Sequence, residues 1–552
     1  MIHIQETTRK LPYYRPLPLT DLPLIYQKEH LFPHMSYGET SPTAVPCVFR
    51  MIVLENEALR VEVAPGLGGR VYSLFDKRIG KEILFGNPVV KPVRIPPVWG
   101  FISGGIEFNF PTVHTPVALE EVGCVTGRTE NHGFIRVGER DARTGMEWVV
   151  ELGLMEGVPA LIQRSAFRNA TDSAQPWTSW TICAVPSTEG TEFIHPGERV
   201  MVSNDRIAWQ PWPGDDLNLE RNIDQMTALS WEPGSATRFG AFHHDLGFGM
   251  MHLADPAQLP GRRIWTFGHG RDRGWGQATT DGRLSYAEIE SSPLSGGPDD
   301  PPFPAGTERR HQEFWIPVHS RDECERVALP DPALPDWENP WLGSSHSAWQ
   351  TEWERFAAGD GPLPDSTVPT GLDLENALRR EAESGNPVAA EQLALWLAFH
   401  GRPGDALPLV ETSARPRARW IAGLIAWHGL NSPQAAVAHL EAGPLDDPFA
   451  IAKLDELLET LGRIDKRISL LDRCPPHPLL VERRANLALA TGQPGEAIRL
   501  LSTFPWQREL QRYMRTDLWK KAKAALGEAT DEIPDFLHED RLARAAPSRP
   551  EP

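Results

Sequence analysis

The sequence predicts two folded parts of different class, a large antiparallel β-sandwich followed by an α-helical repeat domain. The chain has 552 residues, more than the about 250–300 residues that usually share one hydrophobic core. Most of its 52 prolines and 46 glycines lie in the first two thirds, where turns between short strands use them. Near residue 370 the hydrophobic period changes from that of a strand to that of a helix.

Short alternating segments fill the chain from about residue 47 to 320. In LRVEVAPGLGGRVYSLFD the side chains of Leu59, Val61 and Val63 share one face and charged side chains share the other. This period of two residues is typical of a half-buried strand. Many such strands without helices between them favour an antiparallel sandwich or barrel over a βαβ architecture.

Beyond residue 370 small-residue turns recur at Gly401, Gly429, Gly462 and Gly492, spaced 28, 33 and 30 residues apart. Each turn lies between two apolar helical segments, so about four helix pairs stack. The turns and the Ala/Leu positions resemble a degenerate tetratricopeptide array. Such an array binds a partner or a second copy of the chain, or it braces the β domain, and the sequence leaves these alternatives open.

These patterns divide the chain into four parts. We expect a sandwich with an N-terminal extension over residues 1–325 and a Pro/Trp-rich connector over 326–368. Helical repeats follow over 369–530 and a C-terminal tail over 531–552. The connector should pack partly along the sandwich.

Charge and cysteine usage exclude several classes of function. The net charge is -19 without a Lys/Arg block, so we expect no nucleic-acid partner. The five cysteines are scattered without metal-ligand spacing, which predicts reduced thiols, no metal and no cofactor. The sequence shows no signal peptide and no apolar run of the about 20 residues that a membrane span needs. We therefore expect a cytoplasmic protein with no membrane contact.

The segment RLSYAEIESS carries the first candidate site. On a strand Tyr286, Glu288 and Glu290 point to one face. Carboxylates two positions apart have Cα atoms about 6.5–7 Å apart, close enough for repulsion to raise one pKa and make a proton donor. A solvated outer face is the alternative explanation.

The segment GGIEFNFPTVHTP carries the second candidate. Glu107 stands among Ile106, Phe108 and Phe110, so the segment must be at least partly buried. A buried carboxylate without partners is costly. Glu107 therefore has partners or lies at the wall of a polar pocket.

Tryptophans accompany both candidates. Residues 1–360 hold 14 of the 19 tryptophans, among them Trp99, Trp180 and Trp275. Sugars present apolar C–H faces, and proteins commonly hold them with indole rings and carboxylates. This favours a carbohydrate ligand, although several tryptophans must simply fill the β core.

The stretch ENEALRVEVAPGLGGRVYSLFDKRIGKEILFG resembles the opening of the galactose mutarotase-like β-sandwich superfamily. HGFIR, beginning at His132, and YAEIES resemble two further segments of that superfamily, and the likeness covers about residues 47–320. The whole chain is similar to a bacterial family that joins such a domain of unknown function to tetratricopeptide-like repeats, in which GGIEFNFP is a hallmark.

The resemblance implies that Glu288 is the base that deprotonates the anomeric hydroxyl and that His132 binds substrate. It also implies a second histidine as general acid, yet the corresponding stretch NATDSAQPWTSWTICAVPS has no histidine. Glu107 could supply that proton, and a pair of carboxylates across a sugar pocket is the equipment of a glycoside hydrolase.

Three functions follow. The first is a glycoside hydrolase or related enzyme with Glu107 as general acid, Glu288 as base or nucleophile and Glu290 in reserve. The second is an aldose 1-epimerase that uses Glu288. The third is a non-catalytic sugar-binding scaffold whose repeats recruit a partner. The residues expected to bind the small-molecule or oligosaccharide substrate are His132, His114, Arg70, Asn109, Arg164, Trp99, Trp180, Tyr286 and Trp275.

Overall fold

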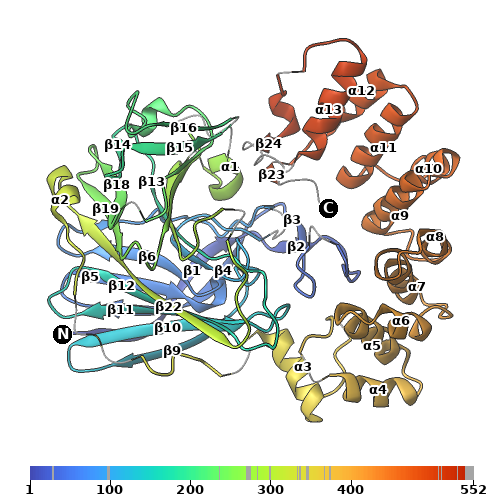
Figure 1. The fold of residues 1–552 in the computed structure, drawn as a ribbon, viewed down its shortest axis with the longest axis horizontal. Helices are drawn as coiled ribbons and strands as arrows, with labels where there is room; N and C mark the ends of the chain where they lie inside the picture. Colours follow the sequence, from blue (N-terminus) through green and yellow to red (C-terminus); the bar gives the residue numbers. More distant parts are fainter. Residues whose placement is uncertain are drawn as a thin grey trace.

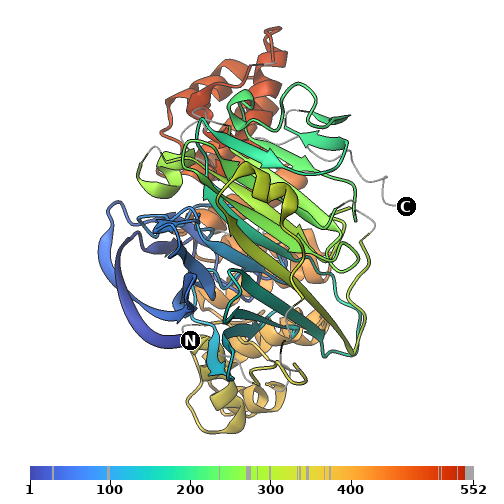
Figure 2. The same cartoon turned by 90° about the vertical axis from the view of Figure 1, so that its left-hand side faces the viewer.

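The computed structural model describes residues 1–27, 30–95, 100–204, 206–234, 236–268, 275–282, 284–297, 300–331, 334, 337–343, 347–365, 367–371, 374–507, 509–510, 513–530 and 532–540. Two antiparallel sheets pack face to face, and a curved row of helices runs along one side of them (Figure 1, Figure 2). The predicted fold class, a β-sandwich followed by helical repeats, is confirmed.

Both sheets are built from strands that lie far apart in the chain. The 12-stranded sheet runs in the order β1 (His3–Tyr13), β4 (Val45–Glu55), β5 (Leu59–Ala64), β6 (Arg70–Asp76), β8 (Ile106–Asn109), β13 (Trp180–Pro186), β21 (Tyr286–Ser292), β20 (Gly261–Thr266), β17 (Thr227–Ser230), β15 (Arg199–Ser203) and β16 (Ile207–Pro211), with β7 (Lys81–Glu82) beside β6. The 8-stranded sheet runs in the order β14 (Thr191–Ile194), β18 (Arg238–His243), β19 (Phe248–Ala254), β22 (Thr307–Val318), β12 (Leu161–Asn169), β11 (Glu147–Met155), β10 (His132–Arg140) and β9 (Gly123–Arg128).

Two short strand pairs and the helices complete the fold. The pairs are β2 (Pro16–Pro18) with β3 (Tyr37–Thr40), and β23 (Glu509–Leu510) with β24 (Glu539–Asp540). The helices are α1 (Trp275–Thr280), α2 (Arg321–Arg326), α3 (Ala348–Ala358), α4 (Glu375–Glu383), α5 (Pro387–Phe399), α6 (Pro403–Ala406), α7 (Pro416–Leu424), α8 (Pro433–Glu441), α9 (Pro448–Thr460), α10 (Ile464–Leu471), α11 (Pro478–Ala490), α12 (Pro494–Thr503) and α13 (Met514–Ala525). No helix among the described residues is long and apolar enough to cross a membrane.

Strand alternation builds the core between the sheets. Leu59, Val61 and Val63 of β5 point into this core, as their spacing predicts. The glycine turn that follows has a packing reason, because a Cβ on Gly69 would lie 2.8 Å from the Cβ of Val137. The turn therefore brings β6 close against the opposite sheet.

The helical repeats follow the predicted turns. Gly401, Gly462 and Gly492 separate the helices of the pairs α5–α6, α9–α10 and α11–α12 and have left-handed φ angles of 73°, 67° and 73°. Gly429, between α7 and α8, is required for a different reason. A Cβ there would lie 2.9 Å from the hydroxyl oxygen of Tyr26, which belongs to the N-terminal part of the chain.

The N-terminal segment between β2 and β3 belongs to the core of the helical array. Leu24, Ile25 and Phe32 pack in one hydrophobic cluster with helices α3 to α9. The indole Nε1 of Trp420 in α7 donates a hydrogen bond to the carbonyl oxygen of Pro23 at 2.8 Å. The N-terminal segment therefore links the sandwich to the helical array, in addition to the connector.

Replacement of Ile25 by Ala is expected to destabilise the helical array although the residue lies in the N-terminal segment between β2 and β3. Ile25 is 1% exposed, and truncation of a buried isoleucine typically costs about 2–5 kcal/mol of unfolding free energy. Urea unfolding followed by helical circular dichroism measures the loss. Leu17→Ala is the matched control, since Leu17 is 43% exposed. An equal midpoint for the two variants would contradict this packing role.

The connector lies along the sandwich. The guanidinium of Arg164 in β12 lies over the ring of Trp337 at 5.0 Å, and Trp349 of α3 donates its Nε1 hydrogen to Glu120 at 3.0 Å.

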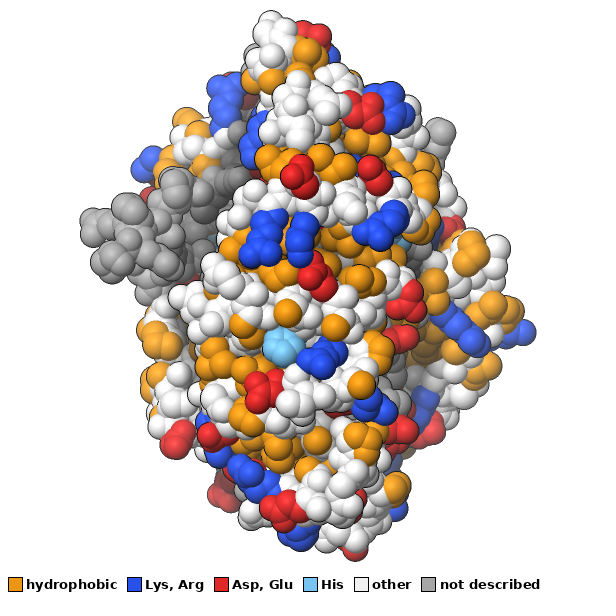
Figure 3. All heavy atoms as spheres, turned by 90° about the vertical axis from the view of Figure 1, so that its right-hand side faces the viewer, with side chains coloured by type: hydrophobic (Ala, Val, Ile, Leu, Met, Phe, Trp, Pro, Cys, Tyr) orange, Lys and Arg blue, Asp and Glu red, His pale blue; other side chains and the backbone are white. Residues whose placement is uncertain are grey.

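On the face of the molecule in Figure 3, basic, acidic and hydrophobic side chains are intermixed. That face therefore carries no extended electrostatic potential of one sign.

Candidate active site

The candidate acids lie on two strands in the middle of the 12-stranded sheet, β8 and β21, which are separated by β13. Glu107 of β8 pairs with Ile182 of β13, which pairs with Glu290 of β21, which pairs with Arg263 of β20. Strands are about 4.8 Å apart, so the Cα atoms of Glu107 and Glu290 are about 10 Å apart. Residues about 180 positions apart in the chain therefore form one row across the sheet.

Strand parity sets the face of this row. Ile106, Phe108 and Ile289 point into the core between the sheets. Their neighbours Glu107 and Glu288 consequently point to the other face, away from the 8-stranded sheet.

A cavity of about 230 Å³ lies over this face. Five aromatic side chains wall it, namely Phe101, Trp180, Trp265, Phe267 and Trp275. Its titratable or charged lining residues are His114, Arg263, Glu288 and Glu290. Drug-sized ligands occupy pockets of about 300–1,000 Å³, so this smaller cavity suits a ligand the size of one sugar ring.

Glu107 lies behind the cavity wall. Its Oε2 is 2.9 Å from Nδ1 of His114, and its Oε1 is 3.6 Å from Nη2 of Arg70. Burial acts to raise the pKa of Glu107, but the attraction of His114 and Arg70 outweighs burial and the net pKa is lowered. Glu107 is thus an ionised carboxylate that holds the ring of His114.

Asn109 fixes the turn that carries His114. Its side-chain oxygen accepts a hydrogen bond from the Thr115 amide at 2.6 Å, and its amide group donates to the Trp180 carbonyl at 3.1 Å. The Asn109 side chain is therefore used within the protein.

Glu288 and Glu290 differ although both line the cavity. Glu290 accepts a hydrogen bond from Nε of Arg263 at 2.7 Å. Burial raises the pKa of Glu288 well above its ordinary value, and repulsion from Glu290 and Glu107 adds to the effect. No hydrogen bond to the Glu288 carboxyl occurs among the described residues. Glu288 therefore keeps its proton to higher pH than an ordinary carboxyl.

Arg263 and Tyr286 organise the aromatic wall. The guanidinium of Arg263 lies 4.2 Å from the Trp180 ring centre and 5.4 Å from that of Trp265. The hydroxyl of Tyr286 accepts a hydrogen bond from Nε1 of Trp275 at 3.0 Å. These contacts fix three indole rings around the cavity.

Two predicted ligand-binding residues lie elsewhere. His132 and Arg164 belong to the 8-stranded sheet and do not line the cavity. Ile135 and Val137 of β10 point into the core, so His132 lies on the opposite face of that strand. Arg164 donates from Nε to Glu151 at 2.9 Å. Their side chains are thus separated from Glu288 by the core of the sandwich, and a substrate-binding role in this cavity does not fit them.

The other predicted residues divide into two groups. His114, Trp180, Trp275, Glu288 and Glu290 line the cavity. Glu107, Arg70, Asn109 and Tyr286 are buried and contact its lining residues. Trp99 lies outside the described residues.

Arg263 and Trp265 are two of the lining residues that were not among the predicted ligand-binding residues. They alternate in GRRIWT as Glu288 and Glu290 alternate in YAEIES, and β20 pairs with β21 so that Trp265 faces Glu288. The alternation was visible in the sequence. The pairing of the two strands was the unknown.

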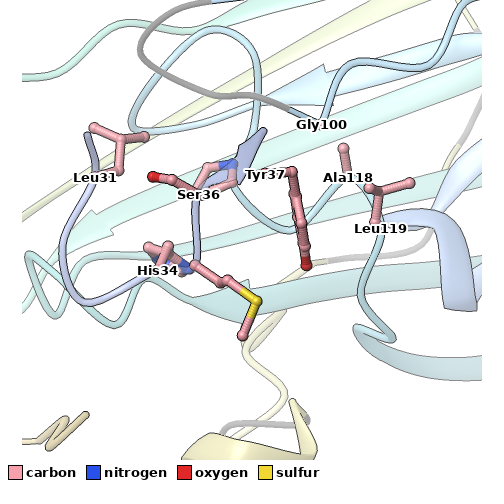
Figure 4. A pocket seen from close by; sticks show the side chains of 9 residues that line it. Leu31, His34, Ser36, Tyr37, Gly100, Ala118 and Leu119 are labelled. Carbon is pink, nitrogen blue, oxygen red and sulfur yellow. The ribbon is translucent and has the colours of Figure 1, made fainter. Parts of the chain in front are cut away.

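A second hollow lies between the N-terminal segment and the loop after β8 (Figure 4). It measures about 10 Å³ and is lined by residues such as His34, Tyr37 and Leu119. Such a volume holds about one water molecule. Among the described residues no group of three His, Cys, Asp or Glu side chains could hold a metal ion.

Comparisons with known proteins match both parts of the chain. A family model described as "Domain of unknown function (DUF5107)" matches residues 27–318. A second model, with the description "-like, C-terminal domain", matches residues 361–522. The crystal structure of a TPR-domain containing protein from Parabacteroides distasonis shares 28% sequence identity with a TM-score of 0.91, over 98% of this chain and 99% of that chain.

Mutarotase-like structures match about half of the chain. A galactose mutarotase-like protein from Lactobacillus casei is 11% identical with a TM-score of 0.37, over 49% of this chain and 100% of that one. A putative aldose 1-epimerase from Escherichia coli K12 is 12% identical with a TM-score of 0.35, over 49% and 98% of the two chains. The family model and the TPR-domain containing protein confirm the predicted combination of a domain of unknown function with tetratricopeptide-like repeats.

Proposed function

The chain belongs to the family described as Domain of unknown function (DUF5107), and since that description names no activity, we propose a function from the geometry of the site. The protein is a carbohydrate-active enzyme that moves protons at the anomeric centre of a single sugar ring. The observation that carries this proposal is that Glu288 and His114 line one aromatic cavity, the first as a carboxyl whose pKa burial raises and the second as an imidazole held by a carboxylate.

The cavity wall supports a sugar ligand. Indole rings pack against the C–H faces of a sugar, and polar side chains at their edges bind its hydroxyl groups. Arg263 and Glu290 provide a donor and an acceptor for the hydroxyls. Sugars are also small enough for a cavity of about 230 Å³.

The acid and base roles follow from the surroundings of each group. Glu288 is the acid, because burial and neighbouring carboxylates hold its proton. His114 is the base, because Nδ1 faces the Glu107 carboxylate and Nε2 remains to exchange a proton with a ligand. The geometry therefore favours Glu288 as the acid, whereas the sequence led us to expect Glu107 as the acid and Glu288 as the base.

The reaction that fits this pair best is aldose 1-epimerisation. Nε2 of His114 takes the proton of the anomeric hydroxyl while Glu288 gives its proton to the ring oxygen, and the bond between C1 and the ring oxygen breaks. Rotation about the C1–C2 bond and the reverse proton transfers close the ring as the other anomer. Both groups return to their starting states, so no co-reactant is needed.

Glycoside hydrolysis is the second candidate. Glu288 and Glu290 both face the cavity, and carboxyl groups on alternate strand positions approach the separations of about 5–9.5 Å found in glycosidases. It ranks second because Arg263 already binds the Glu290 carboxylate. Partner or self-association through the helical repeats is a separate proposal, supported by the match to a TPR-domain containing protein.

Anomer exchange of freshly dissolved hexoses and pentoses, followed by polarimetry and one-dimensional NMR, tests the proposal. The enzyme is expected to raise the exchange rate at least tenfold over buffer for one sugar of the panel. In parallel, release of nitrophenol from aryl glycosides reports hydrolysis. If a sugar changed the tryptophan fluorescence but the protein catalysed neither anomer exchange nor hydrolysis, the proposed enzyme would be rejected in favour of a non-catalytic sugar-binding scaffold.

A further inference from the structure

Residues 84–95, here called the wall segment, form one side of the cavity. Ile95 lines the cavity, and the ring of Phe85 stacks on that of Tyr286 at 4.8 Å. The Phe85 amide donates to the Ala184 carbonyl at 2.9 Å, and the Val93 amide donates to the Phe101 carbonyl at 2.9 Å. The wall segment is thus hydrogen-bonded to the strands and loops around the site.

Helix α1 holds the wall segment on one side. The side-chain amide of Asn87 donates to the Thr279 carbonyl at 3.1 Å, and the ammonium of Lys91 donates to the Gln277 carbonyl at 3.2 Å. Since Trp275 of the same helix lines the cavity, α1 and the wall segment form a continuous rim.

The C-terminal unit, consisting of β23, α13 and β24, holds the wall segment on the other side. Nη1 of Arg94 lies 2.7 Å from Oε1 of Glu509, and their side chains are 10% and 3% exposed. The other oxygen of Glu509 is 3.4 Å from Nη2 of Arg515 in α13. Arg515 also donates from Nε to Glu539 at 3.0 Å. Figure 1 shows this unit at the end of the helical row that returns towards α1.

We infer that Glu509 of the helical array is a positioning residue for the cavity: by binding Arg94 it holds the adjacent Ile95 and sets the affinity for the bound sugar. The inference rests on the proposed function. A guanidinium that loses a buried carboxylate must find another partner or move to water. Arg94 is bonded directly to Ile95 in the chain, so either movement displaces the wall of the cavity.

The substitution Arg94→Ala tests this coupling without removing the partner of Arg515. In the free protein, hydrogen–deuterium exchange of the wall segment is expected to be at least tenfold faster in Arg94→Ala than in the wild type, while β5 and β6 are unchanged. Arg94→Lys keeps the charge and should restore most of the protection. Because this readout needs no sugar, it decides the inference even if the proposed function fails.

Sugar affinity supplies the second readout. With the sugar identified by anomer exchange or fluorescence, Arg94→Ala and Glu509→Gln are each expected to raise KM, or the Kd, about tenfold and to change kcat less than twofold. The double variant should be no worse than Arg94→Ala. Glu496→Gln is the control, because Glu496 pairs with Arg499 on the exposed side of α12.

Unchanged exchange in the wall segment of Arg94→Ala would overturn the inference. Unchanged sugar affinity in a wild type that binds sugar would overturn it too. If Arg94→Ala and Glu509→Gln lowered kcat equally and left KM unaltered, the inference would also fail, because Arg94 would then support the stability of the protein and not the affinity for the sugar. A wild type without any sugar response, combined with faster exchange in the variant, would reject the proposed function and retain the mechanical link.

Discussion

Glu288→Gln is expected to lower kcat for sugar turnover by about 10²–10⁴-fold, the usual contribution of a positioned general acid. Glutamine keeps the shape and the hydrogen-bonding capacity of the side chain but has no proton to transfer. The sugar should still bind, because the aromatic wall is intact, so KM should change little. Polarimetry on the sugar that the wild type interconverts measures the effect.

Two variants separate this role from general damage. Glu62→Gln changes another strand glutamate of the same sheet, on β5, outside the cavity, and should keep wild-type turnover. Glu290→Gln should lose less than Glu288→Gln, since Glu290 is already bound by Arg263. If Glu290→Gln abolished turnover while Glu288→Gln retained it, the general acid would be Glu290 and not Glu288.

Glu288→Gln should also change how the free energy of unfolding depends on pH. The folded-state pKa of Glu288 is raised above its unfolded value of about 4.3. The unfolded chain therefore loses this proton first as pH rises, and each pH unit up to the folded pKa costs about 1.4 kcal/mol of unfolding free energy. Glu288→Gln removes this cost, so the variant should gain stability over the wild type at pH 7 and not at pH 4. Chemical denaturation at both values measures it.

Glu313→Ala is expected to be the most destabilising single change in the sandwich. Glu313 is 0% exposed in the core between the sheets. Its oxygens lie 2.7 Å from Nε2 of His252, 2.6 Å from the Gln163 amide nitrogen and 2.5 Å from the Ser291 hydroxyl. Burial acts to raise the pKa of Glu313, but His252, His311 and the Ser291 hydroxyl outweigh burial and lower it. Removal of a carboxylate from such a buried cluster costs about 3–5 kcal/mol.

Thermal unfolding followed by near-ultraviolet circular dichroism gives the size of this loss. Glu308→Ala is the control on the same strand, β22, because its side chain is 37% exposed and pairs with Arg310. Equal melting temperatures for the two variants would contradict a structural role for the cluster. Glu313→Gln should be intermediate, since the amide still accepts two of the hydrogen bonds.

The sequence predicted local features of the site and not its assembly. The face shared by Glu288 and Glu290 and the burial of Glu107 follow from alternation and from apolar neighbours, which are local properties. Which strands pair is set by contacts between distant parts of the chain. The partners Arg263 and Trp265 were therefore missed, and His132 was assigned to a cavity that its sheet does not reach.

The proposed acid and base roles show the same limit. The pKa of Glu107 depends on Arg70 and His114, and a sequence pattern gives no distance between these groups. His114 was expected to bind substrate, yet its contact with Glu107 makes it the better candidate for proton transfer. The helix α1, only six residues long, was also not predicted, because a short helix shows little periodicity.

The place of the N-terminal segment has a consequence for biosynthesis. Trp420 lies 397 residues after Pro23, whose carbonyl it binds. Ribosomes add about 5–20 residues per second, so the first-made segment waits roughly 20–80 seconds for the helices that enclose it. During that interval Leu24, Ile25 and Phe32 are exposed on the nascent polypeptide, where a chaperone can bind them until translation reaches α9.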